Sequence, residues 1–141
     1  MDNSKPLILF VDDEPALLNA LQRAFRESDF GYLFAQSGPE ALHLLEEHPI
    51  QVVVADMQMP GMNGLELQYQ IKARFPDVVR VLLSGYPNPD PEDVSALVQA
   101  VHRGDIFRFV AKNADMLEAI DEVVELALEH RRLHGSATVS G

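Results

Sequence analysis

The sequence predicts an α/β protein in which a doubly wound, five-stranded parallel sheet lies between two layers of helices, a (βα)5 sandwich. Five short apolar runs alternate with segments whose apolar residues recur at the spacing of one helix face. A helix between consecutive strands implies parallel pairing through right-handed crossovers, with helices on both faces of the sheet. The length of 141 residues is that of about one domain.

The strands are expected where Val, Ile, Leu and aromatic residues follow one another. The third run is the clearest, because β-branched residues favour strands, and the second is the weakest. The five expected strands are residues 7–11, 32–35, 50–55, 78–83 and 106–111.

A helix is expected after each strand. Pro15 suits a first helical turn, and Ser37 and Glu40 have the spacing of a capping box. Asp115 and Glu118 open the last helix. The apolar residues expected to face the sheet are Leu17, Leu18, Leu21, Ala24 and Phe25; Ala41, Leu42, Leu44 and Leu45; Leu65, Leu67, Ile71 and Phe75; Val94, Leu97, Val98 and Val101; and Leu117, Ile120, Val124, Ala127 and Leu128.

Glycine and proline mark the loops and the ends of helices. Residues 59–64 and 86–91 are expected to be irregular, because their prolines and glycines disfavour regular structure. Gly104 is expected near the end of the fourth helix, and Gly135 at the end of the fifth. We therefore expect one domain over residues 1–134, and a flexible tail or the start of a linker over residues 135–141.

Composition excludes several classes of function. The 22 Asp and Glu against 11 Lys and Arg give a net charge of −11, which repels nucleic-acid backbones and anionic membranes. The chain has no cysteine, which excludes disulfides, thiolate zinc sites and cysteine nucleophiles. No apolar run is long enough to span a bilayer, and the first residues lack the pattern of a signal peptide. We expect a cytoplasmic protein.

Polar residues stand where the expected strands end. Asp12 and Asp13 follow the first strand, Asp56 the third, Ser84 the fourth and Lys112 the fifth. Sites in such sheets form at the carboxyl ends of the strands. Three close carboxylates raise one another's pKa, and a hard divalent cation such as Mg²⁺ relieves this repulsion. A carboxylate nucleophile, a metal, a lysine and a hydroxyl suit phosphoryl transfer.

Each of these residues also has an ordinary structural interpretation. Asp13 or Glu14 could cap the first helix, and Asp56 could be a turn residue. Ser84 could belong to a common strand exit, and Lys112 could be a solvated charge. The order of the residues and the motifs around them carry most of the weight.

That order resembles the receiver domain of two-component response regulators. The resemblance rests on the strand-end residues together with the segment Met59-Pro-Gly-Met-Asn-Gly64 behind Asp56, and it runs from about Leu7 to the last helix. It implies the flavodoxin-like strand order 2-1-3-4-5. Residues 104–109 are also similar to the fifth-strand region of receivers that precede HD-GYP or other output domains.

The resemblance implies a role for each carboxylate. Asp56 would take a phosphoryl group from the phosphohistidine of a histidine kinase or a phosphotransfer protein. Mg²⁺ would be bound directly by Asp13, Asp56 and the backbone carbonyl of Gln58, and through water by Asp12.

The resemblance also implies a response to phosphorylation. Lys112 would pair with the phosphoryl oxygens, and Ser84 would be the switch hydroxyl. Phe109 would be the switch aromatic, although it could also be a core residue of the fifth strand. Gln58 and Tyr86 would control the access of water.

One junction departs from the family pattern. The family has Lys-Pro at the end of the fifth strand, usually with a cis bond, whereas this chain has Lys112-Asn113. A cis bond costs about 2.5–4 kcal/mol before a residue other than proline. We therefore predict a trans bond, with Lys112 still reaching the carboxylates and Asn113 or Asp115 capping the last helix.

The implied output is a changed surface formed by the fourth helix, the fifth strand and the fifth helix. That surface would act on an output domain or an effector protein, or form a homodimer. We expect that the protein is not an enzyme, apart from self-catalysed phosphoryl transfer and autodephosphorylation. One alternative is a receiver-like scaffold that acts without phosphorylation. Another is a phosphatase with an aspartate nucleophile, but that class needs a second Asp where this chain has Gln58.

Overall fold

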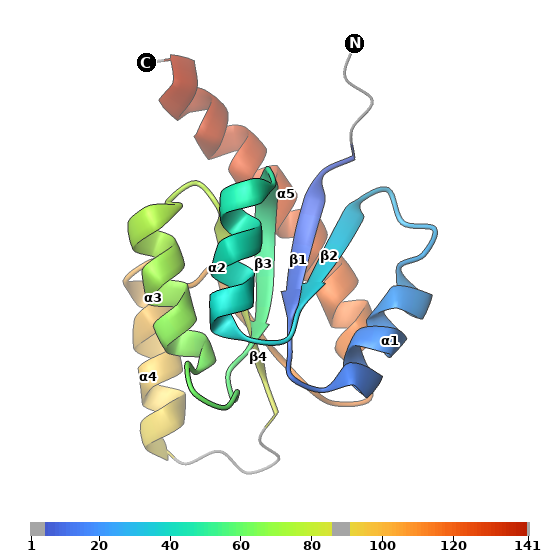
Figure 1. The fold of residues 1–141 in the computed structure, drawn as a ribbon. Coiled ribbons are helices and arrows are strands. Elements are labelled where there is room, and N and C mark those ends of the chain that lie inside the picture. Colours follow the sequence, from blue (N-terminus) through green and yellow to red (C-terminus); the bar gives the residue numbers. More distant parts are fainter. Residues whose placement is uncertain (1–4, 86–90, 141) are drawn as a thin grey trace.

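The computed structural model describes the backbone of residues 5–85 and 91–140 and, outside 91–94 and 135–140, their side chains. Strands and helices alternate along these residues, as the sequence predicted (Figure 1). The five strands are all parallel and lie in the order β2-β1-β3-β4-β5, which confirms the doubly wound fold. They are β1 (Leu7–Val11), β2 (Gly31–Ala35), β3 (Ile50–Asp56), β4 (Val79–Ser84) and β5 (Arg108–Ala111).

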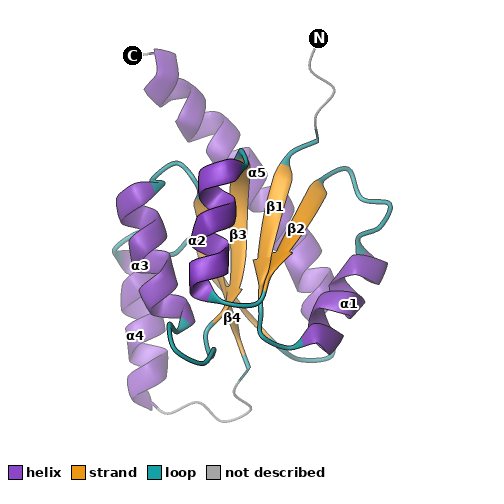
Figure 2. Ribbon diagram, viewed as in Figure 1, coloured by secondary structure: helices purple, strands orange, loops and turns teal. Residues whose placement is uncertain are grey.

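Helices cover both faces of the sheet (Figure 2). One face packs against α1 and α5, and the opposite face packs against α2, α3 and α4. The bounds of the helices are α1 (Pro15–Ala24), α2 (Gly38–Glu47), α3 (Gly64–Arg74), α4 (Pro91–His102) and α5 (Met116–Ser140).

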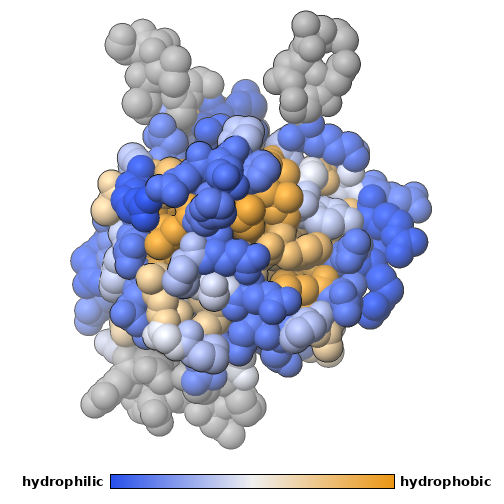
Figure 3. Space-filling model, in the orientation of Figure 1, coloured by the Kyte–Doolittle hydropathy of each residue, from blue (hydrophilic) through white to orange (hydrophobic). Residues whose placement is uncertain are grey.

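The central strands are buried on both faces, which explains their unbroken apolar sequences. In β1, Phe10 belongs to the cluster under α1 and α5, whereas its neighbour Leu9 belongs to the cluster under α2 and α3. Val54 and Val53 divide in the same way in the adjacent strand β3. Outside this core, hydrophilic residues dominate the face of the molecule in Figure 3.

Local capping sets where two helices begin. The Ser37 side chain accepts a hydrogen bond from the Glu40 N–H, but the Glu40 carboxylate accepts from Gln36 instead of closing a capping box. The complete capping box is at α3, between Asn63 and Glu66. The loop predicted at 59–64 therefore ends at Asn63, because α3 starts at Gly64.

Three residues predicted to face the sheet point to solvent instead. Ala24 is exposed, and Val98 and Leu117 are 40% and 37% exposed. A helix buries only a stripe, so apolar residues at the edge of the pattern remain in water. The opposite also occurs at Gln68, which is fully buried on α3 and donates its amide to the Val81 carbonyl at 2.8 Å.

The predicted bounds differ from the structure at both ends of the last βα unit. The fifth strand begins at Arg108, because the N–H of Ile106 bonds the Ala100 carbonyl at the end of α4. The prediction that Gly135 ends the last helix is wrong, since α5 continues to Ser140. A single glycine costs a helix only about 1 kcal/mol and does not force an end.

Other predicted bounds stay open. The irregular segment predicted at 86–91 lies outside the described residues as far as residue 90, and α4 begins at Pro91. The domain boundary at residue 134 and the linker character of residues 135–141 stay predictions.

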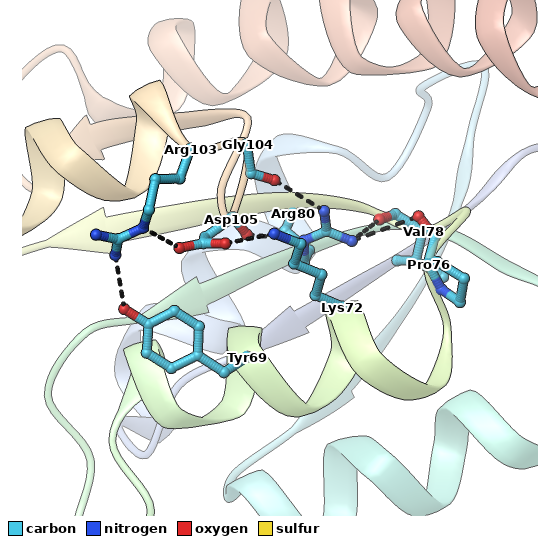
Figure 4. A network of polar contacts seen from close by, with 8 residues as sticks. All are labelled: Tyr69, Lys72, Pro76, Val78, Arg80, Arg103, Gly104 and Asp105. Atoms are coloured by element: carbon cyan, nitrogen blue, oxygen red, sulfur yellow. Dashed lines mark hydrogen bonds and ion pairs between the residues drawn. The ribbon is translucent and has the colours of Figure 1, made fainter.

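A polar network fastens the turn between α4 and β5 to α3 (Figure 4). The Asp105 side chain, which is buried, accepts hydrogen bonds from Lys72 at 2.5 Å and from Arg103 at 2.9 Å. Arg103 also donates to the Tyr69 hydroxyl at 3.4 Å. Gly104, at the turn itself, has a φ of 77°, a conformation that glycine adopts without strain.

Arg80 holds the backbone of the same turn from β4. Its guanidinium donates to the carbonyls of Asp105 at 2.8 Å and Gly104 at 3.1 Å, and also to those of Val78 and Pro76 (Figure 4). Side-chain and backbone contacts thus fix the position at which β5 starts.

We expect Asp105→Asn to destabilise the protein at neutral pH by about 1 kcal/mol, since the amide loses a charge-assisted contact whose cations are half-exposed. The hydrogen bond from Lys72 is the main cause that holds the pKa of Asp105 below its ordinary value; burial opposes this shift, and Arg103 adds to it. A depressed folded pKa stabilises above the unfolded pKa, and the effect is lost as pH falls through the folded pKa. The difference in urea unfolding should therefore shrink below about pH 4. The exposed Asp29→Asn is the control; an equal loss there, or a difference that persists in acid, contradicts the role of the network.

Candidate functional site

The sheet order brings the predicted site residues to one edge. Asp12 and Asp13 follow β1, Asp56 ends the adjacent β3, Ser84 ends β4, and Lys112 follows β5. The strands are in step at this edge, where Asp56 pairs with Leu83 and Ser84 pairs with Ala111. Side chains that are up to 100 positions apart in the sequence therefore meet.

Lys112 contacts the carboxylates at the ends of β1 and β3. Its Nζ lies 2.7 Å from Oδ2 of Asp12 and 3.2 Å from Oδ1 of Asp56. Its stem passes close to Gly85, where an added Cβ would lie 3.3 Å from the Lys112 Cδ. The Lys112 N–H also donates to the Ser84 carbonyl at 2.8 Å. The interpretation of Lys112 as a solvated charge is thus wrong.

The bond between Lys112 and Asn113 is trans, as predicted from the missing proline; the described residues contain no cis peptide. Asn113 then leads the chain into α5. Its side-chain oxygen accepts from the Asp115 N–H at 3.0 Å, and its carbonyl accepts from the Met116 N–H at 3.1 Å. Lys112 reaches both carboxylates from this backbone.

Burial makes the carboxylates electrostatically costly. The side chain of Asp56 is nearly inaccessible, and burial is the main cause that raises its pKa above the ordinary value, followed by the negative charge of Asp12. Lys112 and the N–H of Gln58, 3.3 Å from Oδ1, oppose that rise. Burial alone would lower the pKa of Lys112, but its hydrogen bonds and the charges of Asp12 and Asp56 outweigh this and raise it, so the ammonium stays protonated.

The carboxylates form a group suited to a cation. Oxygen atoms of Asp12, Asp13 and Asp56 all lie within 4.8 Å of one another, the one such group found among the described residues. An all-oxygen set of donors with a net negative charge is what Mg²⁺ prefers. Gln58 is exposed beside them, and its N–H donates to the Asp56 carboxylate.

The capping alternative for the first acidic residues is not supported. Glu14 occupies the N-cap position of α1, yet its side chain makes no capping hydrogen bond. Its N–H donates to Oδ1 of Asp12 at 2.9 Å, and its Oε1 lies 3.7 Å from the Lys112 Nζ. Glu14 thus lies at the edge of the site without being among the residues predicted for it, and its position directly after Asp13 is the signal in the sequence.

The loop behind Asp56 depends on a glycine. A Cβ added at Gly64 would lie 2.2 Å from the Asp56 carbonyl oxygen and 2.8 Å from the Met57 Cα. Both are backbone atoms and cannot move aside as a flexible side chain would. The Gly64 N–H donates to the Met57 carbonyl at 2.9 Å, so the start of α3 is held directly against the end of β3.

Phe109 lies apart from the core. Its side chain is 44% exposed, so the alternative interpretation as a core residue of β5 is wrong. Ser84 is half-buried at the end of β4. Tyr86, predicted to shield the site from water, lies outside the described residues.

Comparison with known proteins agrees with this geometry. Residues 8–124 match the model of the response regulator receiver domain, and the chain belongs to that family. Its similarity to solved receivers extends over almost the whole chain. It aligns with the signal receiver domain of an HD domain-containing protein from Pseudomonas fluorescens Pf-5 at a TM-score of 0.83 and 27% identity, covering 96% of each chain. A receiver domain from Clostridium thermocellum aligns at a TM-score of 0.79 and 25% identity, covering 91% of this chain and 98% of that one.

The curated relatives are longer regulators. The hydrogenase transcriptional regulatory protein HoxA of Cupriavidus necator is 34% identical over 96% of this chain, which covers 27% of HoxA. The DNA-binding transcriptional regulator NtrC of Escherichia coli K12 is 31% identical over 88% of this chain, which covers 25% of NtrC. The chain thus spans about a quarter of the length of these relatives. Within the described residues, none of the helices has the length and apolar character needed to cross a membrane.

We expect Asp56→Asn to stabilise the metal-free protein at neutral pH, by an amount on the order of 1 kcal/mol, because it removes a buried charge next to Asp12. A raised folded pKa means that the charged carboxylate weakens the fold above that pKa, whereas below the unfolded pKa both states are protonated. The gain should therefore shrink as the pH falls through the raised pKa of Asp56, and it should be gone below about pH 4. Thermal melting in EDTA at several pH values measures it; a variant that melts lower at neutral pH contradicts this electrostatic account. Asp77→Asn, at an exposed position, is the control.

Proposed function

We propose that the chain is the phospho-acceptor switch of a two-component phosphorelay, with Asp56 as the residue that receives the phosphoryl group. The observation that carries this proposal is the contact of Asp56 with the Lys112 ammonium, 3.2 Å away, inside a cluster of carboxylates. The donor would be a phosphohistidine of a histidine kinase or a phosphotransfer protein.

The proposed transfer is a displacement at phosphorus. A carboxylate oxygen of Asp56 forms the new O–P bond, while the P–N bond of the phosphohistidine breaks. The electron pair of that bond stays on the imidazole nitrogen, and the product on Asp56 is an acyl phosphate. Lys112 already donates to Asp12 and Asp56, so its Nζ needs only a small shift to bond the phosphoryl oxygens.

The donor set fits Mg²⁺ as the cofactor of this transfer. Asp13, Asp56 and the backbone carbonyl of Gln58 would hold the ion directly, and Asp12 would act mainly through water. Asp12 suits this indirect role because Lys112 and the N–H of Glu14 already occupy its two oxygens. The ion would supply positive charge for the phosphoryl oxygens.

The proposed response uses Ser84 and Phe109. The Ser84 hydroxyl, half-buried one strand from Asp56, would bond the new phosphoryl oxygens. Phe109, now 44% exposed, would turn inward behind it. Phosphorylation would then shift the population between two packings of the surface formed by α4, β5 and α5.

The proposed partners rest on the similarity to longer regulators. We infer that the altered surface acts on an output domain or an effector protein, and that it is the surface through which a homodimer would form. With a net charge of −11 the chain itself would bind neither nucleic acid nor an anionic membrane. A cytoplasmic location and the absence of any catalysis beyond self-phosphorylation and autodephosphorylation belong to the same proposal.

Phosphorylation can be tested directly by mass spectrometry. The wild type, incubated with acetyl phosphate and Mg²⁺, should gain one phosphoryl group; Asp56→Asn should gain none, and Asp77→Asn should label as the wild type does. Full labelling of Asp56→Asn would exclude Asp56 as the acceptor. A wild type that remains unlabelled would favour a scaffold that acts without phosphorylation.

Metal binding can be tested by stability. Mg²⁺ that binds only the folded state should raise the free energy of unfolding, by about 1 kcal/mol at millimolar concentration if the affinity is weak. Asp13→Ala should abolish that increase, because it removes a direct ligand, whereas Asp77→Ala should retain it. An undiminished response to Mg²⁺ in Asp13→Ala would place the ion elsewhere.

A further inference from the structure

A second polar site lies at the end of the sheet opposite to Asp56. There, where β4 and β5 begin, α4 ends and residues 130–134 of α5 lie, a pocket of about 460 Å³ opens. Val79, Val101 and Ile106 give it an apolar lining. Its volume falls within the range of small-ligand sites, about 300–1,000 Å³.

The charge of this pocket is opposite to that of the whole chain. Acidic residues outnumber Lys and Arg by 22 to 11 in the sequence, yet the pocket is lined by three arginines and two histidines against a single carboxylate, Asp77. The basic residues of the lining are Arg80, Arg108, His130, Arg131 and His134, and we call the site the basic pocket.

The arginines of the pocket differ in the hydrogen bonds that they already make within the protein. Arg80 is bound to backbone carbonyls of the α4–β5 turn and supplies mainly charge. Arg108 donates one N–H to the Phe107 carbonyl at 2.9 Å, and its guanidinium lies over the Phe107 ring. The Nε of Arg131 is buried and has no hydrogen-bond acceptor among the described residues. Arg108 and Arg131 are thus less committed to backbone carbonyls of the protein than Arg80 is.

The two histidines form part of the wall of the pocket. The ring of His130 lies between Phe107, with centroids 4.9 Å apart, and His134, with centroids 4.2 Å apart. Burial lowers the pKa of His130, and the neighbouring His134 and Arg108 lower it further, so its ring is neutral at neutral pH. The positive charge of the pocket therefore comes from its arginines.

We propose that the basic pocket binds a small phosphate-bearing anion, with Arg131 and Arg108 as its principal donors. Guanidinium groups bond phosphate oxygens in pairs, which makes arginine the suited side chain. A small anion also fits the charge of the whole chain: a net charge of −11 repels an extended polyanion, but a compact ligand can enter the pocket. This site is separate from the acidic cluster and does not depend on the proposed phosphorylation.

The test is a titration of the full chain with inorganic pyrophosphate, in a buffer without Mg²⁺ and at constant ionic strength. NMR should show saturable shifts of backbone amides in residues 77–80, 104–108 and 130–134. Arg131→Gln and Arg108→Gln should each bind about tenfold more weakly, since each loses a charge-assisted contact. Arg26→Gln, which removes an exposed arginine outside the pocket, should bind as the wild type does.

Two further measurements complete the test. Adenosine monophosphate in place of pyrophosphate separates a nucleotide from a free phosphate: tighter binding of the nucleotide shows that the apolar lining holds its ring system. Thermal melting of each variant verifies that it is folded. Shifts centred on Asp12 and Asp56, an equal loss of binding in Arg26→Gln, or the lack of saturation would each overturn the proposal.

Discussion

The contact between the Lys112 ammonium and two buried carboxylates is the interaction on which the site depends. Asp12 and Asp56 come from β1 and β3, which are neighbours in the middle of the sheet, so the fold itself forces like charges together. Lys112 comes from β5, two strands away from β3, and crosses the end of β4 beside Gly85. Lys112 can reach both carboxylates because of the strand order, the small residue at position 85 and the direction of the chain at Asn113.

One ammonium does not neutralise three carboxylates, so the site keeps a net negative charge. Burial and, after it, the negative charge of Asp12 raise the pKa of Asp56. Protein sites that act on charged groups commonly hold such unfavourable arrangements, at the expense of stability. Elsewhere in the fold, the core is continuous on both faces of the sheet, and Asp105 and Arg80 are engaged at the far turn.

The sequence predicted the elements well because their signals are local. Strands buried on both faces appear as unbroken apolar runs, and the residue after each run identified the site. The strand order came from the family resemblance, since periodicity does not specify which strands pair. The end of α5 was predicted wrongly because one glycine weakens a helix without ending it. Leu117 was predicted to be buried because an apolar residue at the edge of the stripe has the same spacing as a buried one. The basic pocket had no local signal: Arg80, Arg108 and Arg131 are far apart in the sequence and meet only in the folded chain.

The acidic cluster has a physical consequence for encounters in solution. Three carboxylates share one ammonium at the carboxyl ends of the strands, so this edge of the sheet keeps a local negative charge. A cationic group that diffuses near this edge is drawn toward it before contact, which raises the share of productive collisions, and dissolved salt weakens the attraction.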